Sequence, residues 1–471
     1  MGLMSSLYSG ASGIEANTQD LNVIGDNIAN GNTIGFKSSR AVFADALANS
    51  LLGGGGQIGQ GVHVAAVQKI LTQGSLLSTG VATDLAIQGK GFLIVHGNHN
   101  GQVADYYTRA GQLTVDKDGY LTNIEGMRVQ GYNADQTGSV AGSISDLQPG
   151  EQTSPPKATD RVTMAINLDS EAEVLDNKAP PVPWDPKDPA RTSNFSTTTT
   201  VYDDLGNAHS VDIYFRKTAA GAWEWHALIA KADVDGPAAA ATDPEPFKEL
   251  GTGTMTFDLA STPDADVGTT ARADLKTAGT INGYNEEALT ANGLTIDTDG
   301  TTLVIAQNLT TTLANGSSLN FRFALGDKDK IGVTQFASDS TTNFMSQDGY
   351  PTGSLTGLQF DESGHIVGNF SNGQSRNIGQ LALAEFAAND QLDRIGSSLY
   401  AASYKAGERR DGRPAEGGFG AIAPGNLEQS TVDISQEFIR MMSAQRGFQA
   451  NSKTITTADQ LLSELIQLKR T

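Results

Sequence analysis

The sequence of 471 residues contains no cysteine, and it is poor in aromatic and in basic residues. Without cysteine, neither disulfide bonds nor thiolate metal sites can stabilise the fold. Lys and Arg together number 32 against 53 Asp and Glu, which gives a net charge of −21. Nucleic acids and anionic membranes bind basic surfaces, so this balance argues against both as partners. A hydrophobic content of 38%, with 7% aromatic residues, is enough for modest cores.

Long apolar runs are absent as well. No segment of the sequence is long and apolar enough to span a bilayer. The first basic residue is Lys37, and no apolar run of signal-peptide length follows Met1, so we expect no cleavable secretory signal. Met1-Gly2 with Ser6 matches the myristoylation pattern by letter, although so short a pattern is weak support. The sequence therefore predicts no membrane insertion.

The sequence contains no pattern that is typical of a catalytic or metal-binding site. His96 and His99 could share a metal ion, but they lie in a Gly- and Asn-rich turn with no carboxylate or third histidine nearby. The sequence Gly89-Lys90-Gly91 lacks the glycine spacing of a phosphate-binding loop. No nucleophile has a base placed beside it. We predict that the chain is not an enzyme and that it has no cofactor, no metal site and no catalytic residues.

Large apolar side chains recur at every seventh position near both ends of the chain and nowhere between. This spacing places them along one face of a helix at each end. The residues that we expect to form these self-assembly seams are Leu7, Ile14, Leu21 and Ile28 at the front, and Ile434, Phe438, Met441, Phe448, Ile455, Leu462 and Leu465 at the back.

A helix with a single apolar seam needs a partner surface. The two terminal helices therefore pair with each other or pack between subunits, whereas the alternative is that each lies on the middle of its own chain. The glycines Gly10, Gly13 and Gly25 each cost about 1 kcal/mol relative to alanine inside a helix, so the first helix should be weak in isolation. These features favour assembly as the task of the ends.

The interior is typical of β-structure. Three stretches, 115–121, 296–300 and 360–366, share an apolar residue, an Asp and a Gly three places after the Asp, which predicts hairpin turns. The glycine run 53–56 indicates a loop after the first helix. A proline-rich stretch, 149–189, predicts an extended crossing between lobes, and residues 233–330, rich in Thr, Gly and Asp, could form an extra outer lobe.

Both ends of the chain resemble a known family. The stretches 6–30, SLYSGASGIEANTQDLNVIGDNIAN, and 32–40, NTIGFKSSR, are similar to the start of the bacterial flagellar rod and hook proteins, and 425–468 is similar to their closing segment. IQGKGFLIV at 87–95 and YTRAGQLTVDKDGYL at 107–121 extend the resemblance inward. Two middle segments, YDDLGNAHSVDIYFRK at 202–217 and GNFSNGQSRNIGQLALAEF at 368–386, are similar to segments typical of hook proteins.

The resemblance implies a mainly β fold with α-helical termini that pair as a coiled-coil-like domain, with β-rich inner and outer domains between them. The implied domains are a terminal helical domain (1–33 and 427–471), a connecting segment (34–80), an inner β domain (81–147 and 348–426) and one or more outer β domains (148–347), with a possible extra lobe at about 233–330.

The resemblance also implies a function. We expect a structural subunit of the flagellar hook that self-assembles into a curved, flexible tube and transmits motor torque from rod to filament as a universal joint. The alternatives are a stiff distal rod protein or, more remotely, a secreted adhesin or enzyme that carries flagellar-type ends. The implied partners are further copies of the chain, the hook cap protein, the distal rod protein, the hook–filament junction protein and the flagellar type III export gate.

Export leads to the last expectation. The pair Phe43 and Leu47 resembles the apolar element that the flagellar export gate recognises, although a buried turn of helix would explain the same pattern. A subunit without disulfide bonds and with a weak first helix could be threaded unfolded through a narrow channel. The expected location is extracellular, in the hook of the bacterial flagellum, reached without a cleavable signal peptide.

Overall fold

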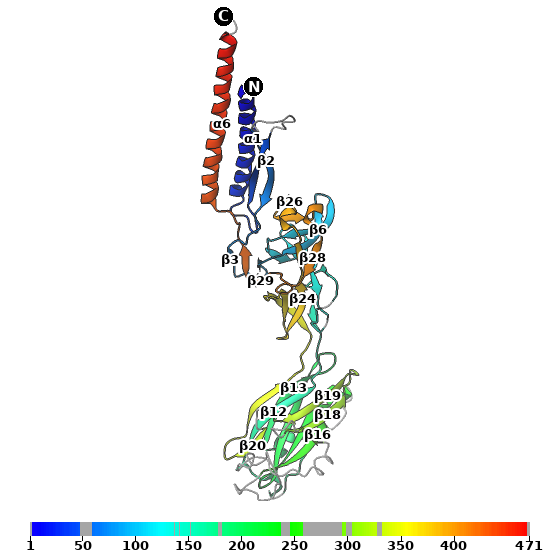
Figure 1. The fold of residues 1–471 in the computed structure, drawn as a ribbon. Coiled ribbons are helices and arrows are strands. Elements are labelled where there is room, and N and C mark those ends of the chain that lie inside the picture. Colours follow the sequence, from blue (N-terminus) through cyan, green and yellow to red (C-terminus); the bar gives the residue numbers. More distant parts are fainter. Residues whose placement is uncertain are drawn as a thin grey trace, which may run out of the picture. The chain divides into compact units, whose positions relative to one another are not determined.

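The computed structural model describes residues 2–47, 59–135, 137–140, 142–150, 152–177, 181–236, 245–257, 294–297, 304–326 and 332–468. The chain divides into two compact units (Figure 1). One, here called the terminal unit, combines Met1–Gln152 with Leu355–Thr471, and the other, the middle unit, is Thr153–Ser354. Both ends of the chain therefore belong to the same unit.

Two long helices lie side by side in the terminal unit (Figure 1). Helix α1 spans Gly2–Ala29 and helix α6 spans Ile434–Leu468. Helix α6 begins where the side chain of Asp433 accepts hydrogen bonds from the backbone N–H groups of Ser435 (2.9 Å) and Gln436 (3.2 Å). The predicted fold class, mainly β with paired terminal helices, is confirmed.

An antiparallel ribbon follows α1 and packs against it. Its strands are β1 (Ser39–Leu47) and β2 (Gly59–Lys69), which pair only with each other among the described strands. The buried side chain of Asn27 fixes the return of the chain, because it donates to Ser39 O (2.7 Å) and accepts from Ser39 N (2.9 Å).

The rest of the terminal unit is a β-structure that draws strands from both halves of the sequence. Strand β5 pairs with β6, β9 and β25, and β9 pairs in turn with β24. Its remaining elements are β3 (Leu76–Ser78), β4 (Leu85–Gln88), β5 (Phe92–His99), β6 (Gln102–Thr108), β7 (Leu113–Val115), β8 (Leu121–Asn123), β9 (Arg128–Asn133), β10 (Ser145–Asp146), β22 (Gly353–Phe360, which begins in the middle unit), β23 (His365–Phe370), β24 (Ser375–Leu381), β25 (Leu383–Phe386), η3 (Asn389–Gln391), β26 (Asp393–Gly396), β27 (Leu399–Ala401), η4 (Tyr404–Ala406), β28 (Arg409–Gly412), β29 (Ala421–Pro424) and β30 (Asn426–Glu428).

The Asp-x-x-Gly hairpin turns are confirmed at two of the three predicted places. Asp116 Oδ1 accepts from the backbone N–H of Asp118 (3.0 Å) and of Tyr120 (2.8 Å), and Asp361 Oδ1 accepts from that of His365 (2.8 Å). The following glycines adopt positive φ, as such turns require. In the third stretch, residues 298–300 lie outside the described part of the chain. The same Asp-x-x-Gly pattern also forms turns at Asp135 and Asp203, which were not among the predicted turns.

The middle unit contains two sheets that share one core. The first is antiparallel, in the order β13-β14-β15-β16, and the second has the order β17-β18-β19-β12-β20 with β21 beside β12. The rings of Trp225 and Phe323, one from each sheet, lie 5.0 Å apart. Its elements are β11 (Thr153–Ser154), β12 (Arg161–Asp169), η1 (Leu175–Asn177), α2 (Pro189–Thr192), β13 (Phe195–Tyr202), β14 (Ala208–Ala219), β15 (Ala222–Ala230), α3 (Lys231–Asp235), β16 (Phe247–Thr256), β17 (Leu294–Asp297), β18 (Val304–Thr312), β19 (Ser318–Leu325), β20 (Val333–Phe336) and β21 (Thr341–Gln347).

The described parts of residues 233–330 are built into these sheets. Strand β16 pairs with β15, and β18 pairs with β19, which lies parallel to β12. Their side chains Leu309, Phe321 and Phe323 are buried in the shared core. An extra lobe therefore stays a prediction for the residues between these strands, of which 258–293 lie outside the described part.

The proline-rich stretch was expected to cross between lobes, and for its later part this is wrong. Residues 175–177 and 181–192, here called the strap, belong to the middle unit. The strap is attached to the middle unit's own strand β14, where Arg216 binds Asp176 and the carbonyl oxygen of Val182. Apart from the short helices η1 and α2 the strap has no regular structure, and the polar side chains of the sheet hold it in place.

Candidate self-assembly surface

Small residues allow the backbones of α1 and α6 to approach closely. A Cβ atom added to Gly10 would lie 2.8 Å from Ile455 Cγ1, and one added to Gly13 would lie 2.5 Å from Asn451 Nδ2. On the other helix, a Cβ on Gly447 would meet Asn17 Oδ1 at 2.8 Å. Glycines that cost helix propensity therefore permit the contact between the helices.

The buried stripe of α6 differs from the apolar seam that the sequence suggested. Glu437, Ala444 and Ala458 are 4–5% exposed, and together with half-buried Asn451 they recur every seven residues. Asp20 of α1 lies close to this stripe, where burial and the neighbouring Glu437 raise the pKa of its carboxyl although Arg440 opposes them. Short or polar side chains thus fill the line between the helices, and large apolar ones are displaced to its flanks.

The seam residues occupy these flanks. In α1, the four seam side chains are all half-buried: Leu7, Ile14, Leu21 and Ile28. In α6, the half-buried members are Met441, Ile455 and Leu462, and the exposed members are Ile434, Phe438 and Phe448. The side chain of Leu465 lies outside the described part. The structure brings Ile455 against Gly10 and Ile434 against Gly31, where an added Cβ would lie 3.4 Å from the Ile434 side chain.

One part of α6 carries an exposed apolar surface, here called the open face. It consists of Phe438, Ile439 and Met442, which lie on one side of the helix, and of Phe448, which lies almost three turns further along and to the other side of Phe438. These four side chains are between 37% and 62% exposed. Ile439 and Met442 are not part of the seven-residue repeat, so the repeat did not predict them. The available signal was that Met442 follows Phe438 by four positions and Ile439 by three. Large apolar side chains gathered on one helix in this way mark an interaction surface.

A buried cluster of charges, here called the junction, connects the helical pair to the β-structure of the terminal unit. Lys37 Nζ donates to Glu428 Oε1 (2.6 Å), and Arg109 donates to Glu428 Oε2 (3.3 Å). The backbone N–H of Gly74 also donates to Glu428 (2.8 Å), and Lys37 donates to the carbonyl oxygen of Thr72 (2.6 Å). Four segments of the chain therefore meet at one carboxylate.

The electrostatics of the junction follow from its burial. The side chains of Lys37 and Glu428 are 1% and 0% exposed, and that of Arg109 is 6% exposed. Burial lowers the pKa of Lys37, although Glu428 opposes the effect. A buried carboxylate with two cations and a backbone donor is well compensated, whereas either cation alone would be costly. All three residues lie in stretches that carry the family resemblance, but no pattern in the sequence indicates that they meet.

The proposed export element lies on the ribbon. Phe43 is in strand β1 and is 44% exposed, so the alternative of a buried turn of helix is wrong. The side chain of Leu47 lies outside the described part of the chain. Whether this pair is recognised during export stays a prediction.

The two histidines considered for metal binding have separate partners. His96 Nδ1 lies 2.7 Å from Asp105 Oδ1, whereas His99 Nε2 lies 3.2 Å from the carbonyl oxygen of Ile395. Among the described residues, no group of three His, Asp or Glu side chains is placed to hold a metal ion. Within the same residues, no helix has the length and apolar character needed to cross a membrane.

Comparison with family models gives four matches along the chain. Residues 7–37 match "Flagella basal body rod protein", 86–175 match "Flagellar hook protein FlgE/F/G D1 domain", 167–350 match "Flagellar basal body protein FlaE D2 domain", and 423–468 match "Flagellar basal body rod FlgEFG protein C-terminal". The matches cover both units.

Curated relatives match over almost the full length. The flagellar hook protein FlgE of Borreliella burgdorferi is 33% identical over 99% of this chain and 100% of its own length. That of Salmonella typhimurium is 33% identical over 98% of this chain and 100% of its own length, and that of Escherichia coli is 31% identical over 97% and 98%. Among solved structures, the Helicobacter pylori flagellar hook protein FlgE2 matches with 16% identity and a TM-score of 0.42, covering 75% of this chain and 100% of its own.

Proposed function

Because this chain belongs to the bacterial flagellar hook protein family, we propose that the open face of α6 is the surface through which its copies assemble. The chain is a structural subunit of the flagellar hook, a self-assembling part of the bacterial flagellum, and its family is not one of enzymes. The proposal concerns the residues that make the contacts between copies.

The observation that supports this proposal is the exposure of Phe438, Ile439, Met442 and Phe448 on a helix that already has a partner in its own chain. Burying a large apolar side chain contributes about 1.5–3 kcal/mol, so four of them offer about 6–12 kcal/mol per contact before the costs of association. A helix that pairs through small residues on one face and leaves large ones on another can contact two neighbours. Such a contact repeats along a polymer.

The other seam residues serve the same surface in this proposal. Leu7, Ile14, Leu21 and Ile28 flank the helix contact on α1, and the remaining α6 members Ile434, Met441, Ile455, Leu462 and Leu465 extend the apolar area. The terminal helical domain, 1–33 and 427–471, then forms the inner tube, and the β domains at 81–147 with 348–426 and at 148–347 form the outer layers, joined to the helices by the connecting segment 34–80.

The mechanical function follows from this arrangement. The tube is curved and flexible, and it acts as a universal joint that transmits motor torque from the rod to the filament. Inner contacts made by helices persist while β domains of neighbouring copies slide past one another. The junction at Lys37, Arg109 and Glu428 supports this proposal, because it fastens the helical pair to the adjoining β-structure and so gives torque a path between them.

Export and the partners belong to the same proposal. The flagellar type III export gate recognises Phe43 and Leu47, and the subunit leaves the cell without cleavage of a signal peptide. Folding takes place at the tip beneath the hook cap protein, and the finished hook contacts the distal rod protein at one end and the hook–filament junction protein at the other. The exposure of Phe43 on a two-stranded ribbon is the structural feature that supports the export element.

Substitution of the open face tests the assembly proposal. We expect the double variant Phe438→Asp and Phe448→Asp to keep its helices, because both side chains are exposed within the chain, but to form no tubes. Circular dichroism measures helicity, and electron microscopy with sedimentation measures assembly of the purified full-length chain. The matched control is Leu205→Asp, since Leu205 is also a large exposed apolar residue (61%) but lies in the middle unit. Normal tubes from the double variant, or loss of tubes from the control as well, would overturn the proposal.

A further inference from the structure

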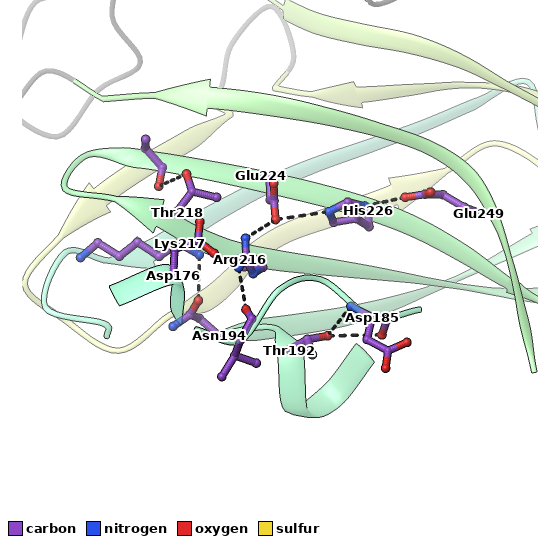
Figure 2. A network of polar contacts seen from close by, with 12 residues as sticks. Asp176, Asp185, Thr192, Asn194, Arg216, Lys217, Thr218, Glu224, His226 and Glu249 are labelled. Carbon is purple, nitrogen blue, oxygen red and sulfur yellow. Dashed lines mark hydrogen bonds and ion pairs between the residues drawn. The ribbon is translucent and has the colours of Figure 1, made fainter. Parts of the chain in front are cut away.

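The strap covers a polar face of the first sheet in the middle unit (Figure 2). On β15, the side chains of Trp223 and Trp225 point into the shared core, whereas Glu224 and His226 alternate with them and face the other way. The strap lies over this second face. It buries Arg216 and His226 of the sheet, although polar side chains on the outer face of a sheet are ordinarily exposed.

The first attachment of the strap is a permanent charge. Arg216 pairs with Asp176 of the strap and with Glu224 of the neighbouring strand (2.6 Å), and it donates to the carbonyl oxygen of Val182 (2.7 Å) (Figure 2). Arginine stays protonated at every pH at which the protein is folded. This attachment therefore persists when the pH rises from neutral to alkaline values.

The second attachment is a histidine. The ring of Trp184 stacks on the ring of His226, with centroids 4.0 Å apart and an angle of 10° between the planes. On its edge, His226 Nδ1 lies 2.5 Å from Glu249 Oε1 of β16, and its Nε2 lies 3.7 Å from Glu224 Oε1. A protonated imidazole between two carboxylates and under an indole ring gains from both ion pairs and from a cation–π contact.

We propose that His226 makes the strap a pH-dependent clasp: the protonated imidazole holds Trp184 against the sheet, and its deprotonation frees this part of the strap while Arg216 keeps the other part attached. The neutral ring keeps only one N–H donor for two carboxylates, and the stacking loses its cationic component. The clasp belongs to the middle unit, so the inference does not rest on the assembly surface.

The ionisable groups around His226 determine whether the clasp closes or opens as the pH rises. Glu224 lies on its own strand, Glu249 on β16, Tyr214 and Arg216 on β14, and Asp176 on the strap. Burial lowers the pKa of His226, but the interactions with the two glutamates outweigh it and leave this pKa above its ordinary value of 6.5. A base with a raised pKa in the folded state stabilises that state below its unfolded pKa, and this stability is lost as pH rises through the folded pKa. The clasp is therefore closed in mild acid and opens on the alkaline side.

Fluorescence of Trp184 provides the test. The emission of this residue is isolated as the difference between the full-length chain and its Trp184→Phe variant, and it is titrated from acid to alkaline pH. A protonated imidazole in contact quenches indole emission, so we expect the emission to rise with a midpoint above 6.5. Glu249→Gln should lower this midpoint, because it removes one ion pair, and His226→Gln should abolish the transition. NMR titration of the His226 imidazole in the unsubstituted chain checks the midpoint independently of any variant.

Trypsin cleavage reports the opening itself. Arg191 lies on the strap, and Lys117 is an exposed site in the terminal unit, so the ratio of cleavage after these two residues corrects for the pH dependence of the protease. We expect this ratio to rise several-fold across the transition in the unsubstituted chain and to stay constant in His226→Gln. A midpoint at or below 6.5, a transition that survives His226→Gln, or a constant ratio in the unsubstituted chain would overturn the clasp.

Discussion

Single residues of the terminal unit show how much depends on Glu428. Its carboxylate is the only anion among the described partners that compensates both Lys37 and Arg109 inside the junction. The backbone carbonyl of the same residue accepts from Gly35 N (2.7 Å), so Glu428 orders both its side-chain and its main-chain neighbours.

Replacing this carboxylate should destabilise the terminal unit strongly. We expect Glu428→Gln to lower the free energy of unfolding by about 3–5 kcal/mol, since it leaves two buried cations without an anion. Denaturant unfolding of the full-length chain measures the effect. The matched control is Glu408→Gln, because Glu408 is exposed, and it should change stability by less than about 0.5 kcal/mol. Equal changes in the free energy of unfolding for the two substitutions would show that the junction does not stabilise the terminal unit.

At this scale the sequence predicted little. Lys37 and Glu428 are 391 positions apart, and a charged residue beside apolar ones is ordinarily a solvated one. What could be predicted was local: Asp116 and Asp361 were identified as turn residues because an Asx turn is completed within five residues of chain. The buried partners of His226 could not be predicted either, because they too come from other segments of the chain.

Secondary-structure elements were predicted better than their contacts. The periodicity of apolar residues located both terminal helices, and their pairing was one of the two arrangements expected. The contact stripe was not foreseen, because the heptad pattern drew attention to large side chains. Glu437, Ala444, Asn451 and Ala458 form an equally regular line. Its members are short or polar, so hydrophobicity alone does not reveal it.

The glycines of α1 allow the helix contact to be tested with a single kind of substitution. We expect Gly25→Ala to stabilise the helix by about 1 kcal/mol, since no atom outside the adjacent backbone of α1 lies within 4 Å of the new methyl group. Gly10→Ala should instead weaken the pairing by about 1–2 kcal/mol, because the methyl group would meet Ile455 at 2.8 Å. Thermal melting followed by the helical dichroism of the full-length chain distinguishes the two. Stabilisation by both variants would mean that the helices do not pack at Gly10 in solution.

At the scale of the whole molecule, the sequence indicated a discontinuous organisation in which the ends combine. That inference came from the resemblance, which links segments at opposite ends of the chain. The separation of residues 233–330 as a lobe rested on composition alone. Composition does not show that β16, β18 and β19 supply core residues such as Phe321 and Phe323 to the sheets of the middle unit.

The middle unit should be removable as a whole but not in part. Strand β11 pairs with β22 through Thr153 with Ser354 and Ser154 with Gly353, so the chain enters and leaves the unit at adjacent points. We expect replacement of residues 155–352 by a two-residue Asn-Gly turn to leave a folded chain that still forms tubes. Excision of 233–330 should instead leave a protease-sensitive middle unit, because it removes three core strands. Sedimentation, electron microscopy and limited proteolysis measure these outcomes, and a shortened chain that neither folds nor assembles would contradict the first expectation.

The pairing of β11 with β22 has a consequence for how such a chain can change over time or by engineering. Two adjacent strand ends form an insertion site for a domain whose own termini lie close together, and the length of the inserted domain can then vary. Foreign domains grafted between Ser154 and Gly353 would be displayed in many copies along one scaffold, provided that they can pass an export channel unfolded and regain their shape outside.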